Sequence, residues 1–244
     1  MRYRTLWAPL GFALGALGGC GGGGGGTSTL PSFPGEAAIN AYLQVAHHST
    51  LSAVDSAGNN YTLQVDRVPS ASTSMFNGSL ANSTEDTATL TKGSAPPTIT
   101  QSITYFLLNP YVPLGKDYGT LFGGCFFCSV RFHGVVTSSF PLPVALMVGD
   151  SGAVANLTYT GYLPRPGVPT LDGYETVTYS VSATPASTLS LLCLDSAISL
   201  VTPQGMADGF SDIPETDCYT ISASGTATLV SVAKSVGGLM LTFK

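Results

Sequence analysis

The sequence predicts an all-β, mostly antiparallel fold that is sandwich-like or barrel-like, with a short helix near the start of the mature chain. Alternating runs rich in Thr, Val and Tyr fill the chain after residue 46, and Gly, Pro, Asn or Asp separates most of them. No run after residue 46 combines a helical period with helix-forming composition. Apolar residues make up 44% of the chain, which favours a packed core over disorder.

The expected elements follow from these patterns in chain order. Residues 36–46 place apolar side chains at helical spacing and predict the short helix, with a strand beginning at Tyr42 as the alternative. Residues 50–54 and 61–65 alternate on either side of a turn-forming segment and predict a β-hairpin. Further strands are expected at 87–91, 98–108, 129–137, 145–148, 153–162, 174–183, 189–200, 219–223, 226–233 and 239–243.

The mature chain divides into two expected β units, 36–140 and 141–244, which together make either two domains or one. The segment 87–96 resembles 176–185, and a turn that opens with Asp55 has a counterpart opening with Asp150. Similar order at a similar offset is the mark of an internal duplication. In a chain this rich in Ser and Thr, chance similarity is the competing interpretation.

The first nineteen residues have the three parts of an export signal. Arg2 and Arg4 supply a positive start, residues 5–16 are mostly apolar, and Gly18 and Gly19 are the small residues at the end. The apolar stretch is shorter than the ~20 residues that a membrane-spanning helix requires. The pattern therefore predicts a cleaved signal over residues 1–19.

The end of this segment, Leu17-Gly18-Gly19-Cys20, resembles the lipobox of bacterial lipoproteins. The resemblance implies that Cys20 receives a diacylglyceryl group, that cleavage precedes it and that the new amine is acylated. Residues 20–35 begin with a glycine run, which suits a flexible tether between a lipid and a folded domain. Gly21 stands where Asp commonly retains lipoproteins at the inner membrane, so the resemblance implies an outer-membrane anchor facing the periplasm or the cell surface.

Two further motifs, Asn109-Pro110-Tyr111-Val112-Pro113-Leu114-Gly115 and Asp217-Cys218-Tyr219, resemble a group of uncharacterised proteobacterial lipoproteins. That resemblance extends over most of the mature chain. It implies class and location, and it implies no activity.

Four cysteines remain if Cys20 carries the lipid: Cys125, Cys128, Cys193 and Cys218. An even number in an oxidising compartment predicts disulfides, and three pairings are open. We favour Cys125–Cys128 with Cys193–Cys218. The alternative for the first pair is a dithiol redox site, although no helix that would lower a thiol pKa is expected there.

The remaining chemistry-bearing residues are few. His47, His48 and His133 lack a Gly-x-Ser-x-Gly nucleophile motif and are interpreted as ordinary histidines. Asp208, Asp212, Glu215 and Asp217 form the one acidic concentration, which matches no calcium-loop spacing and is interpreted as a solvated loop. We expect no metal, no cofactor and no catalytic residue.

Charge and composition narrow the function. The net charge is −5, and removal of Arg2 and Arg4 brings the mature chain to −5 − 2 = −7. Without a basic cluster, nucleic-acid binding is not expected. The sequence favours a non-catalytic binding or structural domain whose partner is an envelope protein or a glycan. The alternative is a periplasmic thiol oxidoreductase that uses Cys125 and Cys128. Aromatic residues that either line a binding surface or belong to the core are Tyr105, Phe106, Tyr111, Tyr118, Phe126 and Phe127.

Overall fold

The computed structural model describes residues 32–121, 131–161, 170–185, 188–210 and 214–244. Its elements in chain order are β1 (Ser32–Phe33), α1 (Gly35–Leu43), β2 (His47–Val54), β3 (Asn60–Pro69), β4 (Ser74–Phe76), β5 (Ser79–Lys92), β6 (Thr98–Leu107), β7 (Val112–Leu121), β8 (Arg131–Ser139), β9 (Leu146–Met147), β10 (Ser151–Gly161), β11 (Leu171–Ala183), β12 (Leu189–Val201), α2 (Pro203–Asp208), β13 (Glu215–Ser222), β14 (Ala227–Val236) and β15 (Leu239–Phe243).

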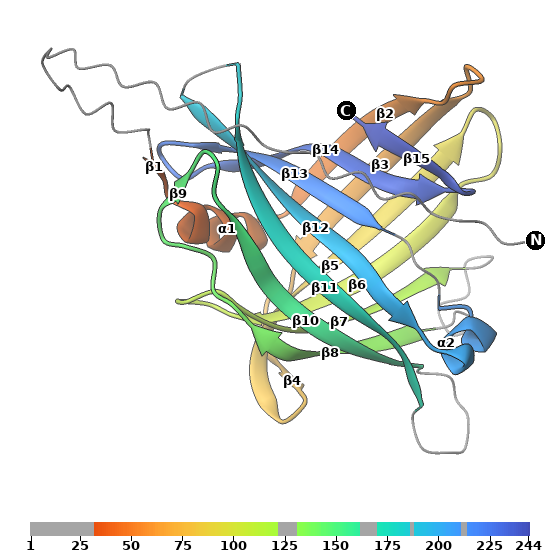
Figure 1. Cartoon of the computed structure of the whole chain (residues 1–244), viewed down its shortest axis with the longest axis horizontal. Coiled ribbons are helices and arrows are strands. Elements are labelled where there is room, and N and C mark those ends of the chain that lie inside the picture. The colour runs from red at the N-terminus through yellow and green to blue at the C-terminus, as the bar shows by residue number, and fades with distance from the viewer. Residues whose placement is uncertain (1–31, 122–130, 162–169, 186–187, 211–213) are drawn as a thin grey trace, which may run out of the picture.

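The strands form one 13-stranded antiparallel sheet that curls into a nearly closed barrel (Figure 1). Neighbours in the sheet follow chain order from β2 to β15; β4 pairs only with β5, and the separate β1–β9 pair lies outside this path. The two ends of the path meet where Ser52 and Lys244 exchange two backbone hydrogen bonds of 3.0 Å. The two edge strands of the curled sheet, β2 and β15, are therefore bridged at this point.

Alternation along each strand divides the sheet into an inner and an outer face. In β3 the buried Tyr61 and Leu63 share a face with Val65 and Arg67. Gly134 on β8 is needed for close approach, because an added Cβ would lie 2.5 Å from the ring of Tyr159. The largest fully buried side chains are Tyr159, Phe33, Phe106, Phe210, Phe243, Leu63, Leu146, Leu192 and Ile221.

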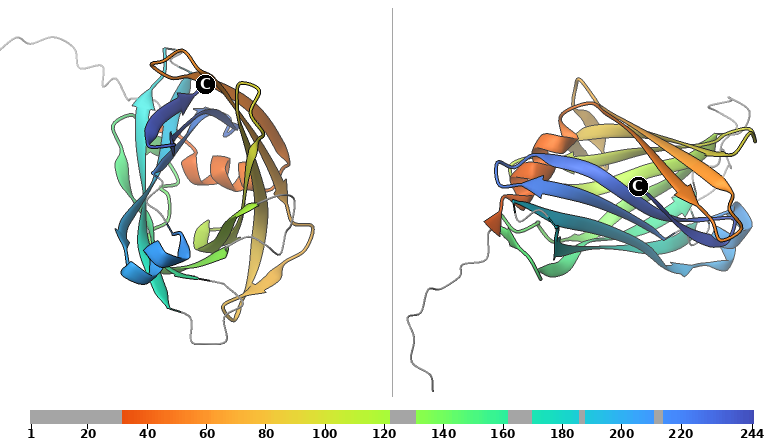
Figure 2. Two further views of the ribbon diagram at one scale, coloured as in Figure 1. Left: turned by 90° about the vertical axis from the view of Figure 1, so that its right-hand side faces the viewer. Right: turned by 90° about the horizontal axis from the view of Figure 1, so that it is seen from above.

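The helix α1 lies within the outline of the curled sheet when the sheet is viewed end-on (Figure 2). Its buried Ile39, Tyr42 and Leu43 belong to the hydrophobic core inside the sheet. The Glu36 carboxylate accepts a hydrogen bond of 3.1 Å from the backbone N–H of Tyr111. The motif that starts at Asn109 thus forms the turn between β6 and β7 together with the first residues of β7, and its Tyr111 is tied to α1.

The short helix α2 lies at the opposite end of the sheet from α1 (Figure 2). The Thr202 hydroxyl caps its N-terminus by accepting a 3.0 Å hydrogen bond from the Gly205 N–H, and Gly209 ends it in the left-handed conformation. Phe210 then enters an aromatic cluster, with ring centroids 5.0 Å from Phe132 and 5.1 Å from Tyr159.

The expected all-β antiparallel class, the helix and the hairpin are confirmed, and the sheet is barrel-like. Three local expectations were wrong. The helix α2 contradicts the absence of helix after residue 46, and it forms because Thr202 caps it and Pro203 suits its first turn. The strand β7 was missed because Pro113, Gly115 and Gly119 weaken its alternation. The small β4 hairpin arm was also missed.

The two expected units, 36–140 and 141–244, contribute to the same sheet. The join falls between β8 and β10, which pair antiparallel from Ala155 opposite Ser139 to Gly161 opposite Phe132. The internal duplication stays a prediction.

Cys193 and Cys218 are joined in a disulfide with an S–S distance of 2.09 Å, the pairing that the sequence favoured. They lie opposite each other on β12 and β13. On β13 the cysteine alternates with the buried Tyr219, so the bridge lies on the outer face. Cys125 and Cys128 lie outside the described residues, as do Cys20 and the whole of the expected signal.

Candidate functional site

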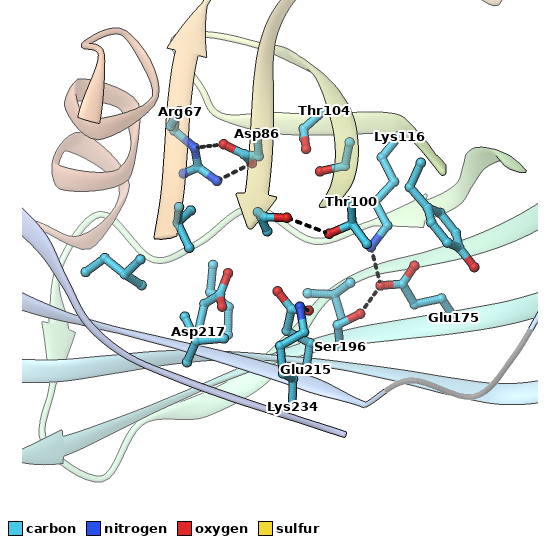
Figure 3. A pocket seen from close by; sticks show the side chains of 18 of the residues that line it. Arg67, Asp86, Thr100, Thr104, Lys116, Glu175, Ser196, Glu215, Asp217 and Lys234 are labelled. Carbon is cyan, nitrogen blue, oxygen red and sulfur yellow. Dashed lines mark hydrogen bonds and ion pairs between the residues drawn. The ribbon is translucent and has the colours of Figure 1, made fainter. Parts of the chain in front are cut away.

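The interior of the sheet contains a cavity of about 590 Å³ (Figure 3). Side chains from α1 and from most strands line it, so residues far apart in the chain meet there. The lining includes Ile39, Leu43, Leu63, Val65, Arg67, Asp86, Ala88, Leu90, Thr100, Thr104, Lys116, Tyr118, Glu175, Leu194, Ser196, Glu215, Asp217, Leu229, Val232, Lys234 and Val236.

Part of the wall is aliphatic and only partly buried. Val65, Ala88, Leu90, Leu194 and Val236 pack against the buried core but keep some exposure. These residues also line the cavity, which explains their exposure on the inner face. An apolar part of a ligand would gain free energy by contacting this wall.

Six charged side chains of the lining form three ion pairs. Arg67 on β3 donates two hydrogen bonds of 2.6 Å to Asp86 on β5, directly opposite in the register. Lys234 on β14 lies 2.8 Å from Glu215, its partner on β13. Only nine Lys and Arg occur in the chain, so three of them inside the sheet is a large share.

The third pair joins Lys116 on β7 to Glu175 on β11, with Nζ 2.9 Å from Oε1. Glu175 is 1% exposed and also accepts hydrogen bonds from Tyr159 and Ser196. Burial acts to raise the pKa of Glu175, but the Lys116 charge and these hydrogen bonds outweigh it and hold the pKa below its usual value. Glu175 is therefore an ionised, fully partnered carboxylate.

Asp217 on β13 differs from the other lining carboxylates. No ion pair or hydrogen bond joins it to the residues that the structure describes, and its Oδ1 is shielded from solvent without a partner. Burial, together with the nearby Glu215 charge, raises the pKa of Asp217 to about 7. Figure 3 shows its side chain in the cavity wall, separate from the paired groups.

The acidic concentration in the sequence is thus not a solvated loop throughout. Glu215 and Asp217 lie in β13 and line the cavity, which corrects that interpretation. They point inward because they share the period-two face of Tyr219 and Ile221, which are buried. Asp212 lies outside the described residues, and Asp208 is in α2.

The three histidines do not line the cavity. His47 and His48 face opposite sides of β2; His47 stacks on Tyr42 with ring centroids 4.0 Å apart. His48 Nδ1 lies 2.5 Å from Asp66 and its Nε2 lies 3.3 Å from the Thr50 hydroxyl. The Asp66, His48 and Thr50 side chains lie on an exposed strand face and do not line the cavity.

His133 belongs to a second outer-face cluster. Its Nδ1 lies 2.6 Å from Asp117, which also accepts a 3.1 Å hydrogen bond from the Tyr105 hydroxyl. Phe76 of the β4 arm stacks on Tyr105 with centroids 4.2 Å apart. The contacts attach the arm to the sheet.

The aromatic residues considered for a binding surface do not gather on one face. Phe106 is buried in the core, and Tyr111 packs against that core. Tyr118 lines the cavity beside the aromatic cluster of Phe132, Tyr159 and Phe210. Phe126 and Phe127 lie outside the described residues.

Sequence reasoning missed Arg67, Asp86, Lys116, Glu175 and Lys234. A usable signal was that residues two apart on a strand point to the same face. Arg67, for example, follows Tyr61, Leu63 and Val65 at spacings of two and so points inward with them. Within the described residues there is no group of three His, Cys, Asp or Glu side chains that could hold a metal. In the same residues, neither helix is long and apolar enough to cross a membrane.

Comparison with known proteins adds no relative. No family model, no curated protein and no solved structure matches this chain.

Proposed function

We propose that this protein is a lipid-anchored protein of the bacterial outer membrane whose barrel-like domain binds a small amphipathic ligand in its interior. The observation that carries the binding role is the cavity of about 590 Å³, with an aliphatic wall and a charged wall. Sites for small molecules commonly have volumes of about 300–1,000 Å³ and combine apolar lining with a few convergent polar groups. The anchor rests on the lipobox-like Leu17-Gly18-Gly19-Cys20.

Binding can be tested with a neutral fluorescent dye, N-phenylnaphthylamine, and a variant that fills the cavity. Ala88 lines the cavity from β5, and the side chain of its neighbour Thr89 points to the opposite, outer face of the same strand. We expect saturable dye fluorescence with the parent chain and with Thr89→Phe, and its loss with Ala88→Phe. Circular dichroism of both variants shows whether each retains the strand content of the parent.

The binding role would be abandoned if the parent gave no saturable signal, or if the folded Ala88→Phe bound the dye as tightly as Thr89→Phe. The anchor has its own test. Cys20→Ser should abolish labelling by radioactive palmitate and release the protein from membranes, and persistent membrane attachment would contradict the anchor.

A further inference from the structure

The charges inside the sheet do not balance. The cavity is lined by three cations, Arg67, Lys116 and Lys234, each with its own carboxylate partner. Among the described lining residues, Asp217 is the carboxylate left over. A buried acidic group without a partner is costly, since ion pairing or hydrogen bonding normally compensates for lost hydration.

The strands on either side of Asp217 offer its carboxylate no hydrogen bond, and Arg67 and Lys234 act on it only from a distance. Its register partners on the two adjacent strands are Leu194 on β12 and Val232 on β14, both aliphatic and both in the cavity wall. Its Oδ1 has no hydrogen-bond partner although solvent does not reach it. The carboxylate is therefore held at the boundary between the aliphatic wall and the ion pairs (Figure 3).

We propose that Asp217 binds the protonated amine of an amphipathic amine whose apolar part packs against Leu63, Leu194 and Val232. This inference rests on the proposed interior binding and names the class of ligand. An ammonium group carries three donors and a full positive charge, so it satisfies a carboxylate that accepts no other hydrogen bond. Aliphatic residues on both neighbouring strands then place the carbon chain beside the charged group.

The other charge classes fit less well. An anionic ligand would meet Asp217 and Glu215, while the three interior cations are already paired. A neutral alcohol could pack against the same wall but would leave the extra negative charge in place. The excess of one carboxylate thus selects a cation.

Binding of the amine should depend on pH. The charged groups that act on the pKa of Asp217 are Glu215 beside it, Arg67 and Asp86 from β3 and β5, and Lys234 from β14. The charge of Asp217 in turn acts on the titratable groups of Tyr42 in α1, Tyr219 in β13 and Lys116 in β7. Because burial raises the pKa of Asp217 to about 7, the carboxylate gains its charge as pH rises through neutrality. The affinity for an amine should rise over the same interval, whereas the affinity for an alcohol should not.

The test is isothermal titration calorimetry with n-octylamine, n-octanol and octanoate. The full chain carries Cys20→Ser, so that no acyl group competes for the interior and no detergent is needed. At about pH 8 we expect Asp217→Asn to weaken octylamine binding by about tenfold or more, which corresponds to loss of one charge-assisted hydrogen bond. Octanol binding should stay within about twofold, and Asp195→Asn, on the outer face of β12, is the matched control.

Each outcome decides a different statement. If octylamine and octanol bind equally and Asp217→Asn changes neither, the amine assignment is overturned while interior binding stands. Tighter binding of octanoate than of octylamine would also overturn the assignment. If no probe binds to the folded parent, the proposed interior binding fails together with it.

Discussion

Glu175 and Asp217 are two carboxylates on the inner wall of the same sheet, and their surroundings are opposite. Glu175, on β11, has a lysine, a tyrosine and a serine as partners. Asp217, on β13, lies between two aliphatic residues and has no hydrogen-bond or ion-pair partner in the part of the chain that the structure describes. The pKa is accordingly lowered for Glu175 and raised for Asp217.

The contrast separates a structural group from a binding group. A buried carboxylate with all its hydrogen bonds made contributes to a single packing arrangement, and removal of one partner leaves a charge exposed to a low dielectric. An unpartnered carboxylate in a cavity reduces stability and so calls for another explanation, which ligand binding provides.

The largest expected effect is loss of the Lys116 charge. Lys116→Met leaves the buried Glu175 carboxylate without its cation, so we expect the free energy of unfolding to fall by about 3–5 kcal/mol near neutral pH. Urea denaturation measures the change. The double variant Lys116→Met/Glu175→Leu should recover most of the lost stability. If Lys116→Met were as stable as the parent, Glu175 would not be the structural group that we take it to be.

A smaller loss is expected from Tyr159→Phe. This change removes the hydroxyl that donates to Glu175 and should cost about 1–3 kcal/mol in the same urea experiment. Tyr118→Phe is the matched control, because Tyr118 packs against Tyr159 with ring centroids 5.6 Å apart but makes no hydrogen bond to Glu175. Equal losses in the two variants would mean that ring packing, not the hydrogen bond, is what matters.

Asp217→Asn should raise the free energy of unfolding, whereas the two preceding variants lower it. The folded-state pKa of about 7 lies above the ordinary aspartate value of 3.8, so the folded chain binds the extra proton and its stability falls as pH rises between these values. At about pH 8 the Asn variant should be more stable than the parent by up to about 4 kcal/mol, because the two pKa values differ by 7 − 3.8 = 3.2 and each pKa unit corresponds to about 1.4 kcal/mol. Below about pH 4 the difference should vanish. A variant less stable than the parent at high pH would show that Asp217 has a stabilising partner.

The smallest effect is expected on the outer face. The His48–Asp66 pair is exposed, at 61% and 47%, so His48→Ala should change the stability by less than about 1 kcal/mol. A double-mutant cycle with Asp66→Ala isolates the pair. A coupling as large as that of Lys116 with Glu175 would mean that burial does not explain the difference between inner and outer pairs.

Much of the fold could be predicted from the sequence because strand alternation is a local signal. The hairpin around residues 55–60 was clear, since Asp55 accepts hydrogen bonds from Ala57 and Asn59 and Gly58 adopts a positive φ. The expected strand at 239–243 matches β15. The strand β7 and the helix α2 were missed because their stability depends on tertiary neighbours and on a cap, not on periodicity.

Little of the candidate site could be predicted. The alternation of side chains along a strand places Arg67 or Lys116 on one face of its own strand. It does not say which strands lie opposite each other across a closed sheet. Glu215 and Asp217 follow turn-forming residues and therefore looked like part of a loop. Their spacing of two from the buried Tyr219 was the overlooked sign that both point inward.

The most direct test of the account is a side-by-side carboxyl titration by carbon-detected NMR of Glu175 and Asp217, assigned with Glu175→Gln and Asp217→Asn. We expect the pKa of Asp217 to be about 7 and that of Glu175 to lie below its ordinary value. Added n-octylamine should lower the pKa of Asp217 and leave that of Glu175 unchanged. An Asp217 pKa near the ordinary aspartate value of 3.8 in the ligand-free protein would contradict the claim that this carboxylate is buried without a partner.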